Sequence, residues 1–354
     1  MQKCNYIVFN AQKQLFQCCN AIILKSYPFI SACIISTFDC YESVIKKHCT
    51  KFEKLNSKNK IQTQINKAKQ FINVRNFYNQ NLFGKGVCVA VIDTGVESVL
   101  DLTVPNNRIL AFKDFTLKSN YYCYDDNGHG TFVAGIIGGN GLLSCGQYSG
   151  VAPECNVVCL KALNQKGEGT TEDILSAMQW IVENKNKYNI KVVCMSFGSE
   201  PQKKDALSEG ANALWNSGLV VVTASGNNGP NYGTITSPGI SSDVITVGAL
   251  DGLNGSLRVA DYSSRGDRSA KFVKPNILAP GTSVVSLSNK VGKQNYTVMS
   301  GTSVATPIIA GVCAILCQKY PFCNPEQIKA HLYNYAVDIG ANKFAQGRGV
   351  FIYK

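Results

Sequence analysis

The sequence predicts an α/β protein with a three-layer, doubly wound and mostly parallel sheet, preceded by a small α+β domain. Two observations predict the main fold. From about residue 65 onward, short apolar runs rich in β-branched residues alternate with helical patterns. Strands of a parallel sheet that is buried on both faces have this composition. The alternation of strand and helix implies right-handed crossovers and helices on both sides of the sheet.

The first 60 residues predict the small α+β domain. Strands are expected at residues 6–9, 21–27, 29–35 and 51–55, with Pro28 separating the middle two. Helices are expected at residues 9–19 and 39–48, the second capped by Asp39. Residues 56–64 (NSKNKIQTQ) are polar and predict an exposed linker. The domains are therefore expected at residues 1–60 and 61–354.

The main domain is expected to contain at least five core strands and four helices. The strands are predicted at residues 87–92, 157–160, 192–195, 219–223 and 244–247. The helices are predicted at residues 131–137, 171–187, 204–217 and 303–319. In sheets of this kind, active sites lie beyond the carboxyl ends of the strands.

Composition and charge narrow the class of protein. The 354 residues are 45% apolar and 10% aromatic, which is typical of a folded globular protein. The formal net charge of +12 is uneven, because residues 1–70 hold 11 Lys/Arg against 3 Asp/Glu and residues 71–354 hold 24 against 20. The basic residues follow no nucleic-acid-binding motif, so a solvated basic face is favoured over nucleic-acid binding.

The cysteines predict reduced thiols. Their number, 15, is odd, and Cys88, Cys313 and Cys317 lie within apolar runs where buried residues belong. Zinc binding is not expected, because paired C-x2-C motifs are lacking and the histidines number three. The apolar run at residues 21–24 is cut off by Lys25, so neither a signal peptide nor a membrane span is expected. A cytoplasmic or other reducing compartment follows, with secretion left open.

Three short segments carry an aspartate, a histidine and a serine. They are VIDTG (residues 91–95), NGHGT (127–131) and SGTSVATP (300–307). Asp93 ends a predicted strand, His129 stands between glycines where a helix begins, and Ser303 opens the last long helix. A serine hydroxyl becomes a useful nucleophile only with a base to take its proton and a carboxylate to orient that base. The three residues supply these groups.

A fourth segment adds a hydrogen-bond donor. The strand at residues 219–223 leads into SGNNG, so the Asn227 carboxamide is expected near the same sheet edge, where it could stabilise an oxyanion together with the N-terminus of the Ser303 helix. Taken singly, a serine in such a turn is usually a helix cap and a histidine between glycines is often a loop residue. The joint pattern favours catalysis. Asp125 and Asp126 are interpreted as a solvated turn.

The order Asp, His, Ser in the contexts D-T-G, H-G-T, S-G-N and G-T-S-x-A-T-P resembles the subtilisin-like serine proteases, the subtilase family S8. The resemblance extends from about residue 65 to residue 354 and looks nearest to intracellular-type bacterial members. It implies Asp93 as the orienting carboxylate, His129 as general base and then acid, Ser303 as nucleophile, and Asn227 as oxyanion donor.

The resemblance also implies a serine endopeptidase that forms an acyl-enzyme and cleaves proteins and peptides with broad specificity. An extended substrate would pair with the edge segment Ser196, Phe197, Gly198. The segment Ala224, Ser225, Gly226 would form the other wall of the first specificity pocket, and Thr236 would give this pocket a neutral floor. The neutral floor favours an apolar or mixed preference over a basic one.

The first 60 residues resemble propeptides that assist folding and inhibit the active site, with autocleavage expected within residues 56–66. The resemblance implies no cofactor for the chemistry and no catalytic metal. Structural calcium stays open without an assigned site, because residues 138–150 lack an Asn-rich calcium loop. Phe132 and Val304 depart from common residues of the family and are expected to affect packing only. The alternative function is a non-catalytic, subtilase-like peptide-binding protein.

Overall fold

The computed structural model describes residues 3–27, 31–55, 64–116, 122–199, 205–253, 255–292 and 294–354. The chain divides into two compact units, Met1–Gln62 and Thr63–Lys354. The expected linker and cleavage segment, residues 56–66, lies largely outside the described residues, as does Lys204 at the start of one predicted helix.

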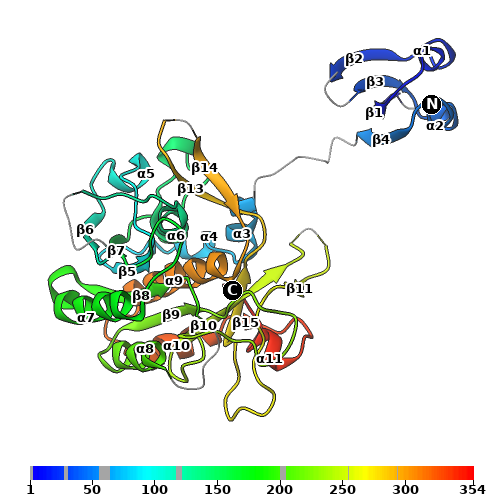
Figure 1. Ribbon diagram of the computed structural model, residues 1–354. Coiled ribbons are helices and arrows are strands. Elements are labelled where there is room, and N and C mark those ends of the chain that lie inside the picture. Colours follow the sequence, from blue (N-terminus) through cyan, green and yellow to red (C-terminus); the bar gives the residue numbers. More distant parts are fainter. Residues whose placement is uncertain are drawn as a thin grey trace. The chain divides into compact units, whose positions relative to one another are not determined.

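The first unit is a four-stranded antiparallel sheet with two short helices (Figure 1). Its strand order is β2-β3-β1-β4, and the strands are β1 (Lys3–Phe9), β2 (Ile22–Tyr27), β3 (Ala32–Phe38) and β4 (Lys51–Leu55). The helices are α1 (Lys13–Cys18) and α2 (Glu42–His48), the latter preceded by a 3-10 turn, Asp39–Tyr41. A small apolar core, which includes Tyr6, Leu15, Ile35 and Ile45, joins the helices to the sheet.

The second unit contains the predicted doubly wound sheet, and this prediction is confirmed. The strand order is β15-β16-β12-β10-β9-β8-β5-β7-β6, and the pairs from β12 to β6 are all parallel. The strands of this order are β5 (Cys88–Asp93), β6 (Ile109–Asp114), β7 (Asn156–Lys161), β8 (Ile190–Met195), β9 (Val220–Ala224), β10 (Ile245–Asp251), β12 (Ile277–Pro280), β15 (Ala336–Val337) and β16 (Val350–Phe351). A short strand, β11 (Arg258–Val259), pairs with β10. Strands β13 (Val284–Lys290) and β14 (Gln294–Met299) form a separate hairpin.

Helices cover both faces of this sheet (Figure 1). Helices α6 (His129–Gly138) and α9 (Thr302–Lys319) pack against each other on one face, and α7 (Thr171–Tyr188) and α8 (Ala206–Asn216) pack together on the other. The shorter helices are α3 (Gln64–Phe71), α4 (Arg75–Tyr78), α5 (Leu100–Thr103), a 3-10 turn η3 (Leu142–Ser144), α10 (Pro325–Tyr333) and α11 (Lys343–Gln346).

Helix α9 runs through the core. Among the described residues it is the one helix whose length and apolar composition would suit a membrane span, but 78% of it is buried inside the protein. It contacts β8, β9, β10 and β12. Its apolar sequence is therefore explained by burial on nearly all sides, as expected for a core helix.

Side-chain caps fix where several helices begin. Thr170 accepts a hydrogen bond from the backbone of Asp173 at the start of α7, and Asp205 does the same for Ser208 at the start of α8. Asn324 and Gln327 form a reciprocal capping box on α10. Each cap satisfies a backbone N–H that the first helical turn leaves without an internal partner.

The 15 cysteines are thiols and not disulfides, and eight of them are buried. Cys88, Cys159 and Cys194 lie on neighbouring central strands, and Cys313 and Cys317 lie on α9. Burial raises the pKa of Cys155 and Cys194 to about 12. These thiols therefore act as small apolar core residues.

Candidate active site

Asp93 lies at the carboxyl end of β5, between β7 and β8. Its backbone carbonyl accepts hydrogen bonds from the amides of Ala162 and Leu163, which follow β7. Its carboxylate oxygen Oδ1 accepts the Thr94 amide at 2.8 Å. The carboxylate is buried and fixed by the sheet, which is the edge where an α/β fold places its site.

His129 begins α6 and contacts that carboxylate. Its Nδ1 lies 2.8 Å from Asp93 Oδ1, and its side chain is 23% exposed whereas that of Asp93 is 1% exposed. Because a carboxylate only accepts hydrogen bonds, the proton of the neutral ring belongs on Nδ1. The second ring nitrogen, Nε2, is then left as an acceptor.

The electrostatics of His129 reflect two opposing effects. Burial lowers the pKa of the imidazole, but the charge of Asp93, the hydrogen bond to Asp93 and the charge of Asp125 raise it more. The pKa of His129 therefore lies above its ordinary value of 6.5. The neighbouring carboxylates stabilise the imidazolium that forms when His129 takes up a proton.

Asp125 organises the loop that carries His129, and here the sequence interpretation was wrong. The residue is buried rather than solvated. Its Oδ1 accepts hydrogen bonds from the Thr94 hydroxyl and the amides of Asn127 and Gly128, and its Oδ2 accepts the amide and hydroxyl of Thr131. Five donors on both sides of His129 thus meet one carboxylate.

The Asp93 turn and the His129 helix approach each other closely. A Cβ added at Gly130 would lie 2.1 Å from the Gly95 carbonyl oxygen. The amide of Gly130 also donates to the Thr94 hydroxyl at 2.9 Å. A side chain at position 130 would push the two segments apart, which explains the glycine that follows the histidine.

Asp126 and Lys161 form an ion pair that the sequence interpretation missed. Lys161 ends β7, is almost fully buried, and places its ammonium 2.6 Å from Asp126 Oδ1. The ammonium also donates to the carbonyls of Thr94 and Leu163. It therefore ties the loop before His129 to the turn after Asp93. In the sequence, the position of this lysine at the end of a strand-like apolar run was the one sign that it could be buried.

Ser303 and Asn227 face a common space at the start of α9. A Cβ added at Gly301 would lie 3.0 Å from Ser303 Oγ and 3.4 Å from Asn227 Nδ2. The Asn227 oxygen accepts the Thr302 amide at 2.9 Å and the Thr302 hydroxyl at 3.0 Å. With its oxygen engaged, the carboxamide presents its NH2 group to the space left by Gly301.

The four predicted site residues form two pairs in the structure. Asp93 and His129 are directly bonded, whereas Ser303 and Asn227 are linked through Gly301 and Thr302. Within the described part of the chain, Ser303 Oγ makes no hydrogen bond to the His129 ring. Helices α6 and α9, which begin with these residues, pack against each other. Bonds between a catalytic base and its nucleophile are often long without substrate.

The predicted pocket segments meet around Thr236. Ser196 is buried, Phe197 is half-buried and Gly198 is exposed after β8, whereas Ala224, Ser225 and Gly226 are buried at the end of β9. A Cβ at Gly198 would lie 2.1 Å from Thr236 Oγ1, and one at Gly226 would lie 2.6 Å from Thr236 Cγ2. The Thr236 amide donates to the Ser225 carbonyl. Thr236 thus fills the space between the two glycines.

Side-chain oxygens in and beside residues 138–150 accept hydrogen bonds from the protein. The nearby carboxylate of Asp101 accepts the Leu143 amide at 2.9 Å and the Tyr296 hydroxyl at 2.7 Å. The Asn140 side-chain oxygen accepts the Leu142 amide. Each of these oxygens thus accepts a hydrogen bond, whereas a calcium ion takes six to eight oxygen ligands. In the described residues, no group of three or more His, Cys, Asp or Glu is placed to hold a metal.

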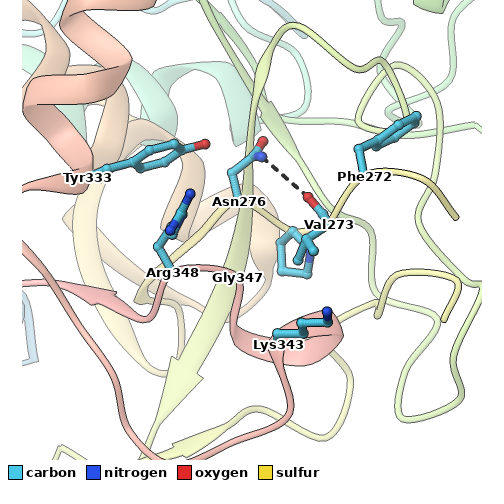
Figure 2. Close-up of a pocket in the computed structure, with 8 residues that line it drawn as sticks. Phe272, Val273, Asn276, Tyr333, Lys343, Gly347 and Arg348 are labelled. Atoms are coloured by element: carbon cyan, nitrogen blue, oxygen red, sulfur yellow. Dashed lines mark hydrogen bonds between the residues drawn. The ribbon is translucent and has the colours of Figure 1, made fainter.

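A separate cavity of about 430 Å³ lies away from these residues (Figure 2). It is lined by Phe272, Val273, Pro275, Asn276, Tyr333, Lys343, Gly347 and Arg348. Asn276 precedes β12, so this cavity lies at the amino end of that strand, whereas Asp93 lies at the carboxyl end of a parallel strand. The cavity is not part of the candidate active site.

The protein is thus a doubly wound α/β protein in which Asp93, His129 and Ser303 follow one another along the chain, at the end of β5 and in the first turns of α6 and α9. A sequence profile described as the subtilase family, Peptidase_S8, matches residues 84–349. The chain therefore belongs to the subtilase family, the subtilisin-like serine proteases. The family resemblance seen in the motifs is confirmed.

Similar proteins support this placement. The chain is 41% identical to serine protease AprX of Bacillus subtilis over 296 residues, which cover 77% of this chain and 65% of AprX. It is 35% identical to a subtilisin of Bacillus sp. over 70% of this chain and 60% of that protein. The chain thus spans less than two thirds of the length of these two relatives. The solved structure of sphericase matches with a TM-score of 0.69 and 32% identity, over 81% of this chain and all of sphericase.

Proposed function

We propose that the protein is a serine endopeptidase that hydrolyses peptide bonds through an acyl-enzyme. The observation that carries the proposal is the 2.8 Å contact between His129 Nδ1 and buried Asp93 Oδ1. This contact selects the tautomer whose Nε2 can accept a proton. With Ser303 at the start of the helix packed against α6, the chain has a nucleophile, a base and an orienting group.

The reaction follows from these groups. Ser303 Oγ attacks the substrate carbonyl carbon while its proton passes to His129 Nε2, and the imidazolium is stabilised by Asp93. His129 then gives the proton to the leaving amine, and the C–N bond breaks to leave an acyl-serine. A water molecule, deprotonated by the same nitrogen, attacks the ester and releases the acid and the serine hydroxyl.

The developing oxyanion would be bound beside Gly301. Asn227 Nδ2 and the backbone N–H of Ser303 are the proposed donors, since the first turn of a helix has N–H groups without internal partners. The positive end of the 18-residue helix α9 adds to this stabilisation. These donors are fixed before substrate arrives, because Thr302 holds the carboxamide.

Substrate would bind as an extended strand along residues 196–198, with the side chain before the cleaved bond entering between that segment and residues 224–226. Backbone pairing gives affinity with little sequence selection, which supports broad specificity. Thr236 at the closed end is neutral. We infer a preference for small or medium-sized apolar side chains, because Thr236 already contacts both glycine positions.

The first unit is proposed as a propeptide that inhibits the second until the chain is cut within residues 56–66. Its fold as a compact unit of its own supports this role. The 15 cysteines, which form no disulfide among the described residues, support a reducing compartment. N-terminal sequencing of active material tests the propeptide proposal, and a mature chain that still begins at Met1 contradicts it.

The activity itself is tested by cleavage of casein. We expect activity that is abolished by a serine-directed sulfonyl fluoride and by Ser303→Ala, and that is retained in Ser300→Ala, an exposed serine of the same turn. Peptide binding without cleavage by the processed protein would favour the alternative, a non-catalytic peptide-binding subtilase. Cleavage that resists the fluoride would exclude Ser303 as the nucleophile.

A further inference from the structure

Lys274 is a buried lysine that the proposed mechanism does not use. Its side chain, which precedes β12, is 3% exposed. The ammonium nitrogen lies 3.0 Å from the Val244 carbonyl, 2.7 Å from Thr246 Oγ1 and 3.0 Å from Asn276 Oδ1. Three oxygen atoms from the starts of two adjacent parallel strands, β10 and β12, therefore surround one nitrogen.

All three oxygens must accept hydrogen bonds from Lys274. The Thr246 hydroxyl uses its one hydrogen to donate to the Gly239 carbonyl at 2.6 Å. The Asn276 oxygen is identified as such because it also accepts the Thr246 amide at 2.8 Å. Three acceptors require three N–H donors, which an ammonium has and a neutral amine lacks.

The cluster therefore holds a positive charge despite its burial. Burial and the neighbouring Lys329 lower the pKa of Lys274, and Asp243 opposes them. Carbonyl, hydroxyl and amide oxygens are also the ligands that hard metal cations take. Asn276, which lines the cavity in Figure 2, directs its oxygen to Lys274 and its NH2 group to the Val273 carbonyl, 3.4 Å away.

Arg108 plays a comparable part beside residues 138–150. Its buried guanidinium donates to the carbonyls of Gly138, Cys155 and Asp101. Three backbone carbonyls in and beside this loop thus surround a side-chain cation. At two separate places in the second unit, uncharged oxygens therefore surround a side-chain cation.

We propose that the Lys274 ammonium takes the place of a bound metal ion at the start of β10 and β12, so that this edge of the sheet is stable without metal. The cluster is consequently a latent cation site. Replacing Lys274 by an acidic residue removes the ammonium, adds an anionic oxygen ligand and opens the cluster to a divalent cation. This inference concerns stability and does not depend on peptidase activity.

The test compares thermal unfolding of the full chain in EDTA and in calcium, in a Ser303→Ala background that prevents self-digestion. Lys274→Glu is expected to gain a calcium response of at least about 5 °C in Tm beyond that of the parent, rising with the logarithm of the calcium concentration. Lys274→Met, which keeps the aliphatic length without the charge, is expected to melt below the parent in both buffers.

Lys185 supplies the matched control. Its ammonium donates to one carbonyl, that of Ser217, so Lys185→Glu is expected to show no added calcium response. A Lys274→Glu variant that folds only with calcium supports the proposal. The proposal is overturned if Lys274→Glu responds to calcium no more than the parent, if it stays unfolded in calcium while Lys274→Met folds, or if Lys274→Met melts with the parent.

Discussion

The carboxamide oxygen of Asn227 is held by both donors of Thr302, the backbone amide at 2.9 Å and the hydroxyl at 3.0 Å. Thr302 is the residue immediately before Ser303, so one contact sets the relative position of the proposed oxyanion donor and the proposed nucleophile. The free NH2 group and Ser303 Oγ both border the space that Gly301 leaves open. This geometry leads to the first two predictions.

Asn227→Leu should lower kcat and leave KM nearly unchanged, because its NH2 group would bind the oxyanion and not the ground-state carbonyl. The expected loss is about 10²–10³, the magnitude measured for one such donor in a subtilisin. Thr302→Val removes one of the two bonds that hold the carboxamide and should give a smaller loss in kcat. Steady-state kinetics on a chromogenic peptide distinguish the two, and an unchanged kcat in Asn227→Leu would remove Asn227 from the mechanism.

Gly301→Ala should abolish activity while the protein stays folded. The added methyl group would lie 3.0 Å from Ser303 Oγ and 3.4 Å from Asn227 Nδ2, where the oxyanion is expected. Gly255→Ala is the control, since that position has open space around it. Circular dichroism checks folding, and peptide hydrolysis checks activity. Full activity in Gly301→Ala would place the oxyanion elsewhere.

The pH dependence of kcat/KM should report His129. The imidazole acts as a base only when neutral, so activity falls as pH drops through its pKa, which lies above 6.5. Asp93→Asn should shift this acid limb to lower pH and reduce kcat by about 10⁴, as in other triad enzymes with the wrong histidine tautomer. An acid limb that does not move in Asp93→Asn would mean that another group titrates.

The same pKa shift has the opposite effect on stability. Because the folded pKa of His129 is raised, its contribution to stability is full below the unfolded pKa and is lost as pH rises through the folded pKa. Activity and this part of the folding free energy therefore change in opposite directions over one pH interval. The free energy of unfolding, measured at several pH values in the parent protein and in Asp93→Asn, gives the contribution of His129 to stability.

Strand and helix positions could be predicted because local patterns determine them. The run at residues 87–92 became β5, and the glycine-flanked His129 became the first residue of α6. The proposed orienting acid, base and nucleophile were chosen on the same ground, since strand ends and helix starts meet at one edge of a parallel sheet. The sequence could not show that Asp125 is buried, because its five donors come from residues 94–131 and meet only in three dimensions.

The contacts of the buried cations could likewise not be predicted from the sequence. Lys161 and Lys274 occur among apolar residues, but whether a lysine points outward or into a cluster of carbonyls depends on the loops of neighbouring strands. Phe132 and Val304, expected to affect packing only, are buried. For the two lysines the missing information is long-range contact, which a local pattern does not contain.

Thr236→Gly should enlarge the proposed specificity pocket. The threonine side chain contacts the positions where Gly198 and Gly226 lack a Cβ, so its removal opens the space between the two walls. We expect kcat/KM for peptides with a large aromatic residue before the cleaved bond to rise relative to peptides with alanine there. Thr234→Gly, in the same loop, should leave this ratio unchanged. Equal ratios in the two variants would exclude Thr236 from the pocket.

Asp125→Ala should destabilise the folded protein by about 3 kcal/mol or more, since it leaves buried amide and hydroxyl donors of the His129 loop without their charged acceptor. Because the same donors position His129, activity should fall even where the protein remains folded. Denaturant unfolding in the Ser303→Ala background measures the free energy, with Glu168→Ala as an exposed acidic control. A loss below about 1 kcal/mol, typical of a surface substitution, would contradict an organising role for Asp125.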